Sequence, residues 1–302
     1  RRFKVRDSYS TGFTTSTGLA EGCALSCYGM LIMDDIMHRY IAAQYPLLRV
    51  LSFVDNWDFI TWNAQAATQQ LDALLEFASL ADLTVDRQKT YAWSTSAEVR
   101  ANLRSLGIPV KHAAKDLGAH VAFSRQHTNS TVTSRLDALT PFWTQLRQSR
   151  ASYRSKLRAL RTVAWPRGLF AVESAPISDN TWLCQRRHAN KALSMDKPGV
   201  NPMLLLGLVE AYVDPEFVAL IRTVGETRLN CPLDFWASDL FPLAAGITNS
   251  PPSSPAAVLL GRIQKVGIAI KPTGHWEDRI GLFHPAHVNF AELCHRLQWQ
   301  WH

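Results

Sequence analysis

The chain has few cysteines and no long apolar run, and each shortage excludes a class of protein. Its five cysteines are scattered at positions 23, 27, 184, 231 and 294. An odd set without regular spacing excludes a secreted disulfide framework and is typical of reduced thiols in the cytoplasm or nucleus. No apolar run approaches the ~20 residues that a membrane-spanning helix needs, because residues 203–213 are too few and include Glu210. We therefore expect an intracellular protein, nuclear or cytoplasmic, without a membrane partner.

Zinc-binding cysteine pairs are absent as well. The chain contains no Cys-x2-Cys pair, which is the usual signature of a structural zinc site. The C-terminal segment does gather residues that bind zinc elsewhere, together with tryptophans: His284, His287, Cys294, His295, Trp276, Trp299 and Trp301. Without a cysteine pair, we interpret them as part of ordinary helical packing.

Basic charge is present but confined to one region. The formal net charge of the 302 residues is +7, from 32 basic and 25 acidic residues. Residues 124–191 contain twelve Lys or Arg and three Asp or Glu, which gives +9 there and leaves −2 for the rest. A local basic region of this kind is typical of a protein that binds nucleic acid. The length allows a sizeable core and predicts two or three domains or subdomains.

Residues 145–164 contain no acidic residue. Their apolar side chains recur at helical spacing, and their arginines fall on a neighbouring face about 90° away, so we predict one helix. Its apolar stripe is Leu146, Tyr153, Leu157, Leu160 and Ala164, and its arginine stripe is Arg147, Arg150, Arg154, Arg158 and Arg161. A solvated surface helix is the ordinary interpretation. However, arginines without acidic partners repel one another, and contacts with phosphates explain them better.

A hairpin is predicted around Asp55 and Asn56. The runs at residues 50–54 and 57–61 are rich in β-branched and aromatic residues, so the two polar residues between them form the expected loop. A carboxylate at a hairpin tip suits a catalytic metal, although Asp-Asn between strands is more often ordinary turn chemistry. Asp58 follows on the outgoing strand, where we expect a solvated side chain. The neighbouring segments decide between these interpretations.

Four segments follow one another in a fixed order. They are Thr17-Gly18-Leu19-Ala20-Glu21-Gly22-Cys23-Ala24-Leu25-Ser26, then Phe53-Val54-Asp55-Asn56-Trp57, then Leu83-Thr84-Val85-Asp86-Arg87-Gln88-Lys89-Thr90, then Lys115-Asp116-Leu117-Gly118. A helix is expected from the first segment to about residue 45, and another over residues 64–80. In this order the chain resembles a reverse transcriptase, most closely the palm and thumb of the non-LTR (LINE-type) retrotransposon polymerases. That family has a Gly-x-x-Gln-Gly-x-x-x-Ser block, a Tyr/Phe-x-Asp-Asp hairpin, an Asn-x-x-Lys-Thr block and a Leu-Gly pair.

The resemblance implies an RNA-directed DNA polymerase, a nucleotidyltransferase that uses Mg²⁺ (or Mn²⁺). Its partners would be an RNA template, a DNA primer, their RNA:DNA hybrid and a dNTP. Asp55 would be a catalytic metal ligand, and Lys89 would steady the departing pyrophosphate. Contacts to nucleotide or template are implied for Gly18, Glu21, Gly22, Ser26 and Asn56, and a primer grip for Lys115, Leu117 and Gly118. The arginine stripe would lie in the thumb, with Arg186, Arg187, His188 and Lys191 extending it.

Three departures from the family pattern leave catalysis open. Asn56 stands where the family has a second aspartate, and Glu21 stands where it has a glutamine. The family's other metal-binding aspartate lies on a strand before the Gly18 block, so we expect the chain to begin inside the domain, without its fingers and upstream palm strand. The alternatives are a non-catalytic nucleic-acid-binding relic of a reverse transcriptase domain and a purely structural helical module. If the polymerase interpretation holds, Asp55 must lie near the helix that Gly22 opens.

The expected fold class is α+β, with three regions. Residues 1–123 are predicted to form the C-terminal half of a polymerase palm, with short antiparallel strands and helices. Residues 124–195 are predicted to form a helical thumb, divided into two halves by Trp165-Pro166-Arg167-Gly168. Residues 196–302 are expected to be helical in part, with a Ser/Pro linker at 248–255.

Overall fold

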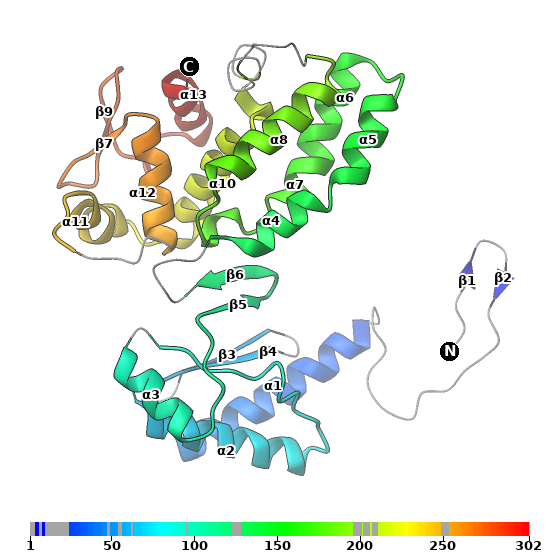
Figure 1. Ribbon diagram of the computed structural model, residues 1–302. Helices are drawn as coiled ribbons and strands as arrows, with labels where there is room; N and C mark the ends of the chain where they lie inside the picture. The colour runs from blue at the N-terminus through cyan, green and yellow to red at the C-terminus, as the bar shows by residue number, and fades with distance from the viewer. Residues whose placement is uncertain are drawn as a thin grey trace. The chain divides into compact units, whose positions relative to one another are not determined.

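The chain forms two compact units, Arg1–Val110 and Lys111–His302. The computed structural model describes residues 4–5, 8–9, 24–46, 49–53, 56–61, 63–94, 96–122, 128–195, 201, 206, 211–248 and 254–301. Helices are combined with antiparallel sheets of two or three strands (Figure 1), which agrees with the predicted α+β class. The predicted palm boundary at residue 123 lies inside the second unit, so the Leu117-Gly118 hairpin belongs with the helices that follow it. No helix in the described ranges is long and apolar enough to cross a membrane.

The first unit combines a small core with three helices and two hairpins. Its elements are β1 (Lys4–Val5), β2 (Ser8–Tyr9), α1 (Ala24–Gln44), β3 (Arg49–Phe53), β4 (Asn56–Ile60), α2 (Ala64–Leu80) and α3 (Ala97–Ser105). The predicted helices to about residue 45 and over 64–80 are confirmed. Helix α2 begins where Asn63 accepts a hydrogen bond from the backbone N–H of Ala66, at 2.7 Å, which satisfies one of the free amides of the first turn.

The β3–β4 hairpin packs one face on helices α1 and α2. Val50, Trp57 and Phe59 on this inner face contact a core that includes the buried Met37 and Phe77. Residues on the other face alternate with these and are exposed, as the two-residue period of a strand requires. The hairpin therefore has one face that buries apolar side chains and one that is open to solvent.

The two-residue connection of the hairpin lies one residue earlier in the chain than predicted. Phe53 pairs with Asn56, so Asn56 is the first residue of β4 and not part of the loop. The two residues that join the strands are Val54 and Asp55, which lie outside the described residues. The alternation of apolar side chains predicted the two strands. It did not determine which two residues connect them, because a connection at 55–56 and one at 54–55 are both compatible with that pattern.

The second unit begins with a hairpin and a helical layer. Its elements are β5 (Ala113–Asp116), β6 (Ala119–Ala122), α4 (Ser130–Asp137), α5 (Thr140–Gln148), α6 (Tyr153–Ala159), η1 (Leu160–Ala164), α7 (Trp165–Gly168), η2 (Val172–Ser174) and α8 (Asp179–Ala192). The helices enclose a core in which Trp143 and Trp165 lie 5.6 Å apart between ring centroids. Leu136, Leu160 and Leu169 fill the space around them.

A second core lies toward the C-terminus of the same unit. It is formed by η3 (Ala211–Val213), α10 (Pro215–Asn230), η4 (Trp236–Leu240), α11 (Phe241–Ala244), α12 (Pro255–Lys265), β7 (Ala269–Ile270), β8 (Trp276–Glu277), β9 (Leu282–Phe283) and α13 (Phe290–Trp301). Arg262 is buried between α10, α12 and η2, where it donates to the carbonyl of Val172 at 2.9 Å and to the Thr223 hydroxyl. Burial lowers the pKa of Arg262 to about 10.

The single helix predicted over residues 145–164 is wrong. Helix α5 ends at Gln148, and α6 begins at Tyr153 after an extended segment. The side chain of Ser152 accepts a hydrogen bond from the backbone N–H of Ser155 and caps α6. The apolar period remained in phase across this break, so the period alone did not reveal it.

The break predicted over Trp165-Pro166-Arg167-Gly168 occurs only at its last residue, since α7 ends at Gly168 and the helix passes through Trp165 and Pro166. The helix continues through this pair, because η1 takes up a π turn in which the backbone N–H of Trp165 bonds the carbonyl of Leu160, five residues back. Proline has no N–H and its ring crowds the carbonyl four residues before it, so a widened turn before Pro166 keeps the helix intact. The same arrangement recurs in η4, which is followed by Phe241-Pro242.

Gly168 allows α7 to approach α4 closely. A Cβ atom at this position would lie 2.7 Å from Leu136 Cδ2 and 3.0 Å from Leu139 Cδ1. We expect Gly168→Ala to lower the free energy of unfolding by about 1–3 kcal/mol, since both leucines are fully packed. Gly261→Ala in α12 is the matched control, because a Cβ there meets no atom within 4 Å. It should leave stability unchanged or raise it by about 0.5–1 kcal/mol, and a loss as large as at Gly168 would contradict the packing argument.

Candidate nucleic-acid interface

Part of the predicted polymerase site falls outside the described residues. Gly18, Glu21, Gly22 and Asp55 are among these, so the expected proximity of Asp55 to the helix opened by Gly22 stays a prediction. Ser26 lies in α1. Asp55, the predicted metal ligand, is flanked by two described strands, β3 and β4.

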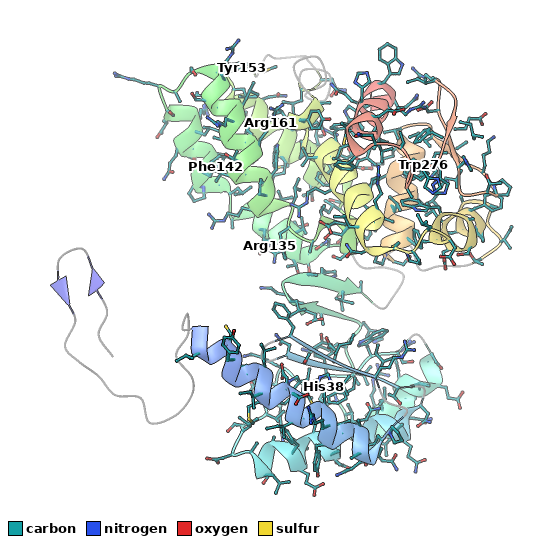
Figure 2. The ribbon with its side chains drawn as sticks, turned by 180° about the vertical axis from the view of Figure 1, so that it is seen from behind. His38, Arg135, Phe142, Tyr153, Arg161 and Trp276 are labelled. Atoms are coloured by element: carbon teal, nitrogen blue, oxygen red, sulfur yellow. The ribbon has the colours of Figure 1, made fainter. Side chains whose placement is uncertain are left out.

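Helix α1 and the hairpin are held together by polar contacts as well as by the core. Trp57 Nε1 donates to the Asp34 carboxylate at 2.8 Å, and His38 Nε2 lies 3.1 Å from the Ser52 hydroxyl. His38 is shown on α1 in Figure 2. These contacts fix the orientation of the strands β3 and β4 on α1.

The open face of the hairpin is more apolar than charged. Leu51 and Phe53 are exposed by 58% and 61%, and Asn56 and Asp58 lie on the same face, two residues apart along β4. The expected solvated position of Asp58 is confirmed. The polar side chains of β4 on this face are thus one amide, Asn56, and one carboxylate, Asp58.

Lys89 lies in a surface turn. Its ammonium group contacts the Asp86 carboxylate at 3.3 Å, and Asp86 also accepts backbone hydrogen bonds from Gln88 and Lys89. The hydrogen bond from the Lys89 side chain, together with that from the Gln88 amide, lowers the pKa of Asp86. Both side chains of this ion pair are exposed, so water and salt weaken it and leave Lys89 able to exchange Asp86 for a phosphate.

The Leu117-Gly118 pair, expected in the primer grip, forms the tight turn between β5 and β6. Both residues have positive φ, 43° and 83°, which is the geometry of a type I′ turn. Arg135 donates to the carbonyls of Gly118 and Phe170, and its guanidinium lies 5.0 Å from the centroid of the Phe170 ring. A Cβ at Gly118 would lie 3.1 Å from Arg135 Nη2 and 3.2 Å from Phe170. The protein itself therefore requires glycine here, whether or not a primer approaches.

The predicted arginine stripe is divided among α5, the segment after it, α6 and η1. All five arginines are exposed: Arg147, Arg150, Arg154, Arg158 and Arg161. No acidic side chain in the described part of the chain forms an ion pair with the first four. Lys156 on the same helix is buried instead and donates to the carbonyl of Ala192 at 3.1 Å. The positive charges are thus presented from two helices and their connection, with Leu146 and Leu160 buried beneath.

The extension of this surface to Arg186 is wrong. The Arg186 guanidinium is buried and donates to Asp214 at 2.7 and 3.0 Å and to Glu216 at 2.7 Å. Burial alone lowers the pKa of Arg186, but the hydrogen bond with Asp214 and the two carboxylate charges outweigh it, so the pKa is raised. Lys265 joins the network through Glu216 at 2.8 Å and Asp179 at 2.9 Å. Sequence reasoning missed these partners, although Asp214-Pro215-Glu216 is a recognisable start of a helix.

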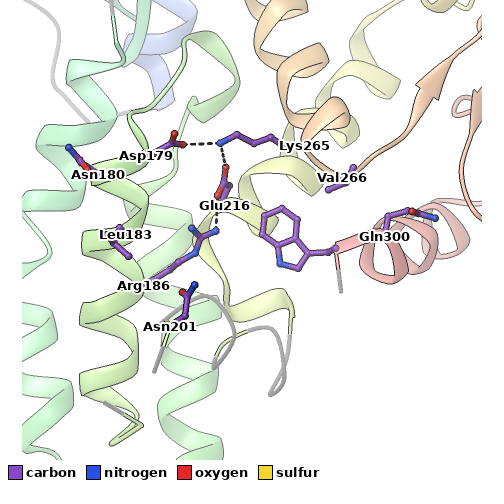
Figure 3. Close-up of a pocket in the computed structure, with 10 residues that line it drawn as sticks. Asp179, Asn180, Leu183, Arg186, Asn201, Glu216, Lys265, Val266 and Gln300 are labelled. Atoms are coloured by element: carbon purple, nitrogen blue, oxygen red, sulfur yellow. Dashed lines mark hydrogen bonds and ion pairs between the residues drawn. The ribbon is translucent and has the colours of Figure 1, made fainter. Parts of the chain in front are cut away.

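This ion-pair network lies beside a cavity of about 470 Å³ (Figure 3). Two basic and two acidic side chains line it, Arg186 and Lys265 with Asp179 and Glu216, and each base is paired with an acid. Among the described lining residues the charges are therefore balanced, and these residues offer no surplus positive charge to a phosphate.

His188 also turns inward. Its imidazole stacks on Trp143 with 6.0 Å between ring centroids and 8° between planes. Burial, followed by the charge of Lys191, lowers the pKa of His188 below its ordinary value of 6.5. Arg187 beside it is exposed, so the predicted surface retains Arg187 and Lys191 but loses the two residues that pack into the protein.

This lowered pKa predicts a stability loss in acid. The unfolded chain binds the His188 proton more readily than the folded chain, so stability is full above the ordinary pKa and falls as the pH drops below it. His284, whose pKa burial and two neighbouring histidines also lower, adds to the same trend. We expect urea denaturation between about pH 7.5 and about pH 5.5 to show a smaller decrease for His188→Gln than for the wild type. An identical pH dependence in both proteins would contradict this account.

The C-terminal histidines do not gather around a metal position. His284 stacks on His287 with 4.3 Å between ring centroids, and Cys294 is buried on α13. Among the described residues, no group of three or more His, Cys, Asp or Glu is arranged to hold a metal ion. Asp55, where the resemblance implies magnesium, lies outside the described residues, so its role as a metal ligand stays a prediction.

Comparison with known proteins gives no relative. No protein-family model, no curated protein and no solved structure matches this chain.

Proposed function

We propose that this chain is the palm and thumb part of a reverse transcriptase of the LINE type, and that it binds a template-primer duplex through the arginines of α5 and α6. The observation that carries the proposal is the set of exposed arginines without acidic partners among the described residues: Arg147, Arg150, Arg154 and Arg158. Arginines so close together repel one another unless an external anion neutralises them.

A nucleic-acid backbone suits this surface better than a small anion. The four positions are spread over two helices and their connection, so several phosphates at regular spacing can be neutralised at once. Each neutralised phosphate releases a counterion, which makes affinity depend on salt and not on base sequence. An RNA:DNA hybrid of A-form shape displays its sugars and phosphates in the same way, so shape and backbone contacts are sufficient.

The palm role is supported by the order helix, hairpin, helix in the first unit. Helix α1 and helix α2 cover one face of β3–β4, and Asp55 belongs to the two residues that join these strands. Carboxylate oxygens are the ligands that Mg²⁺ prefers, so Asp55 would be the residue that holds the ion, with Asn56 beside it. When bound, Mg²⁺ (or Mn²⁺) would neutralise charge on the reacting phosphates. The exposed Lys89 would steady the leaving pyrophosphate.

A second candidate is a non-catalytic nucleic-acid-binding relic of the same domain. It is favoured by Asn56, which begins β4 on the exposed face where a second carboxylate is expected. An amide keeps the hydrogen-bonding shape of a carboxylate but lacks its charge. Both candidates require the arginine surface, so they agree on binding and differ only in chemistry.

The binding test is a titration of the chain with a short RNA:DNA hybrid at increasing salt. We expect affinity to fall steeply with salt and to depend little on base sequence. The Arg150→Ala, Arg154→Ala, Arg158→Ala triple variant should flatten the slope of log K against log salt by at most about three units, one for each lost phosphate contact.

A charge-matched pair of variants serves as the control. Arg154→Ala with Arg158→Ala removes two charges from α6, and Arg87→Ala with Arg279→Ala removes two exposed charges elsewhere. The first pair should weaken binding far more than the second. Salt-independent binding, or equal effects of the two pairs, would contradict a thumb-like role for α5 and α6.

A further inference from the structure

A cavity of about 570 Å³ opens at the end of the arginine row on α6. Its lining in the described residues is Arg161, Trp165, Pro166, Tyr212, Val218 and Arg222. These residues come from η1, α7, η3 and α10, all within the second unit. The volume lies in the range of about 300–1,000 Å³ that is usual for ligand pockets.

The aromatic walls of the cavity are fixed in place. Trp165 is buried and donates from Nε1 to the carbonyl of Val213 at 3.0 Å, which ties α7 to η3. Tyr212 is half-buried and meets Phe217 edge to face, with 5.4 Å between ring centroids. The cavity therefore keeps an aromatic surface without rearrangement, and a planar group can stack on it at little entropic cost.

One basic side chain of the cavity, that of Arg222, has no acidic partner among the described residues. Arg161 places its guanidinium 5.9 Å from the centroid of the Tyr212 ring, at the edge of the aromatic wall. Arg222, half-buried on α10, forms no ion pair or hydrogen bond with any described residue. The cavity beside Arg186 has its bases paired with acids, so of these two cavities this one is suited to an anion.

The cavity continues the proposed nucleic-acid surface. Arg154, Arg158 and Arg161 follow one another at spacings of four and three residues along α6 and η1, so they share one side of the helix. Arg161 is shown on this segment in Figure 2. The π turn of η1 lies between the row and the cavity, and single π turns within helices are frequent at functional sites. A strand that follows the arginines would reach the cavity at Arg161.

We propose that this cavity binds one unpaired nucleotide of the bound strand, a step that rests on the proposed function and deepens it. The base stacks on Tyr212 beside Trp165, and its phosphate is neutralised by Arg222 and Arg161. Stacking on an aromatic side chain together with a basic groove is the general means by which proteins hold single-stranded nucleic acid without reading its sequence. The cavity thus distinguishes a duplex with an unpaired end from a fully paired one.

The test compares two probes on the whole chain at low salt. One is a blunt RNA:DNA hybrid, and the other is the same hybrid with a single unpaired 2-aminopurine nucleotide at its end. We expect the second probe to bind more tightly, with its fluorescence quenched by stacking. Tyr212→Leu should remove this gain, a loss of about 5- to 100-fold, and leave blunt-end affinity unchanged. Tyr212→Phe keeps the ring and should behave as the wild type.

Two further variants test the phosphate contact. Arg222→Gln should remove most of the gain, and Arg279→Gln, an exposed arginine between β8 and β9, is the charge-matched control that should keep it. Free 2-aminopurine nucleoside monophosphate separates a loose nucleotide from one within a strand. The free monophosphate should displace the hybrid with the unpaired nucleotide only weakly. If it displaces that hybrid as well as the unlabelled hybrid does, the assignment of the cavity to a strand end is overturned.

The outcomes separate this proposal from the function on which it rests. Equal binding of both hybrids without quenching overturns the cavity proposal and leaves the arginine surface standing. Failure of both hybrids to bind overturns both. A gain that survives Tyr212→Leu and Arg222→Gln shows that the unpaired nucleotide binds elsewhere.

Discussion

Replacing Arg186 with leucine is expected to destabilise the second unit by about 3–5 kcal/mol. The change leaves the carboxylates of Asp214 and Glu216 buried without the guanidinium that donates to both. Asp214 is fully buried and also caps α10 through the backbone N–H groups of Glu216 and Phe217, so its charge has no route to water. The free energy of unfolding in urea, followed by tryptophan fluorescence, measures the loss.

The adjacent residue supplies the control for this prediction. Arg187 lies next to Arg186 on α8 but is exposed, so Arg187→Leu should change stability by less than about 0.5 kcal/mol. Arg186→Lys should fall between the two, because an ammonium group neutralises a carboxylate but cannot donate in the bidentate geometry. Because the chain has two units, the unfolding of the second must be resolved from that of the first. Equal effects of the two leucine variants would refute a buried ion pair.

Local patterns were sufficient to predict the simplest elements. The helix expected over residues 64–80 is found at Ala64–Leu80, and the structure shows that Asn63 caps its first turn. The strands β3 and β4 followed from the two runs rich in β-branched and aromatic residues. In each case the determining contacts lie within a few residues along the chain.

Predictions that depended on competing local signals were less successful. The apolar period across residues 145–164 predicted a continuous helix, but the cap at Ser152 separates α5 from α6 without disturbing that period. Pro166 predicted a break, yet a π turn accommodates it. A single capping hydrogen bond, which contributes about 1 kcal/mol, decides where a helix begins or ends, and the apolar period of the sequence carries no information about it.

The candidate site was least predictable where partners are distant in sequence. Arg186 was expected among the surface arginines, but its carboxylate partners lie 28 and 30 residues away, on another helix. The cavity between Arg161 and Arg222 likewise requires η1 and α10 to be adjacent. The exposure of the four arginines at positions 147, 150, 154 and 158 was anticipated, although they lie on two helices and their connection and not on the one helix predicted.

The last prediction concerns chemistry at the hairpin. Two Mg²⁺ ions that face a triphosphate need carboxylates from separate strands. The hairpin supplies Asp55, with the uncharged Asn56 next to it at the start of β4. The resemblance implies that the other carboxylate comes from a strand upstream of Gly18. We therefore expect the 302 residues alone to show no primer extension, and a fusion that supplies the family's upstream palm strand to extend a primer in Mg²⁺.

Two substitutions at the turn make this expectation specific. In the active fusion, Asp55→Asn should abolish extension, because the ion loses its charged ligand on this side, while duplex binding through the arginines remains. Asn56→Asp adds a carboxylate beside the ion and should keep or raise extension, most clearly at low Mg²⁺, where tighter metal binding has the largest effect. Extension that survives Asp55→Asn would show that this residue is not a metal ligand. A fusion that remains inactive with aspartate at position 56, on a template-primer that a known reverse transcriptase extends, would favour the non-catalytic relic.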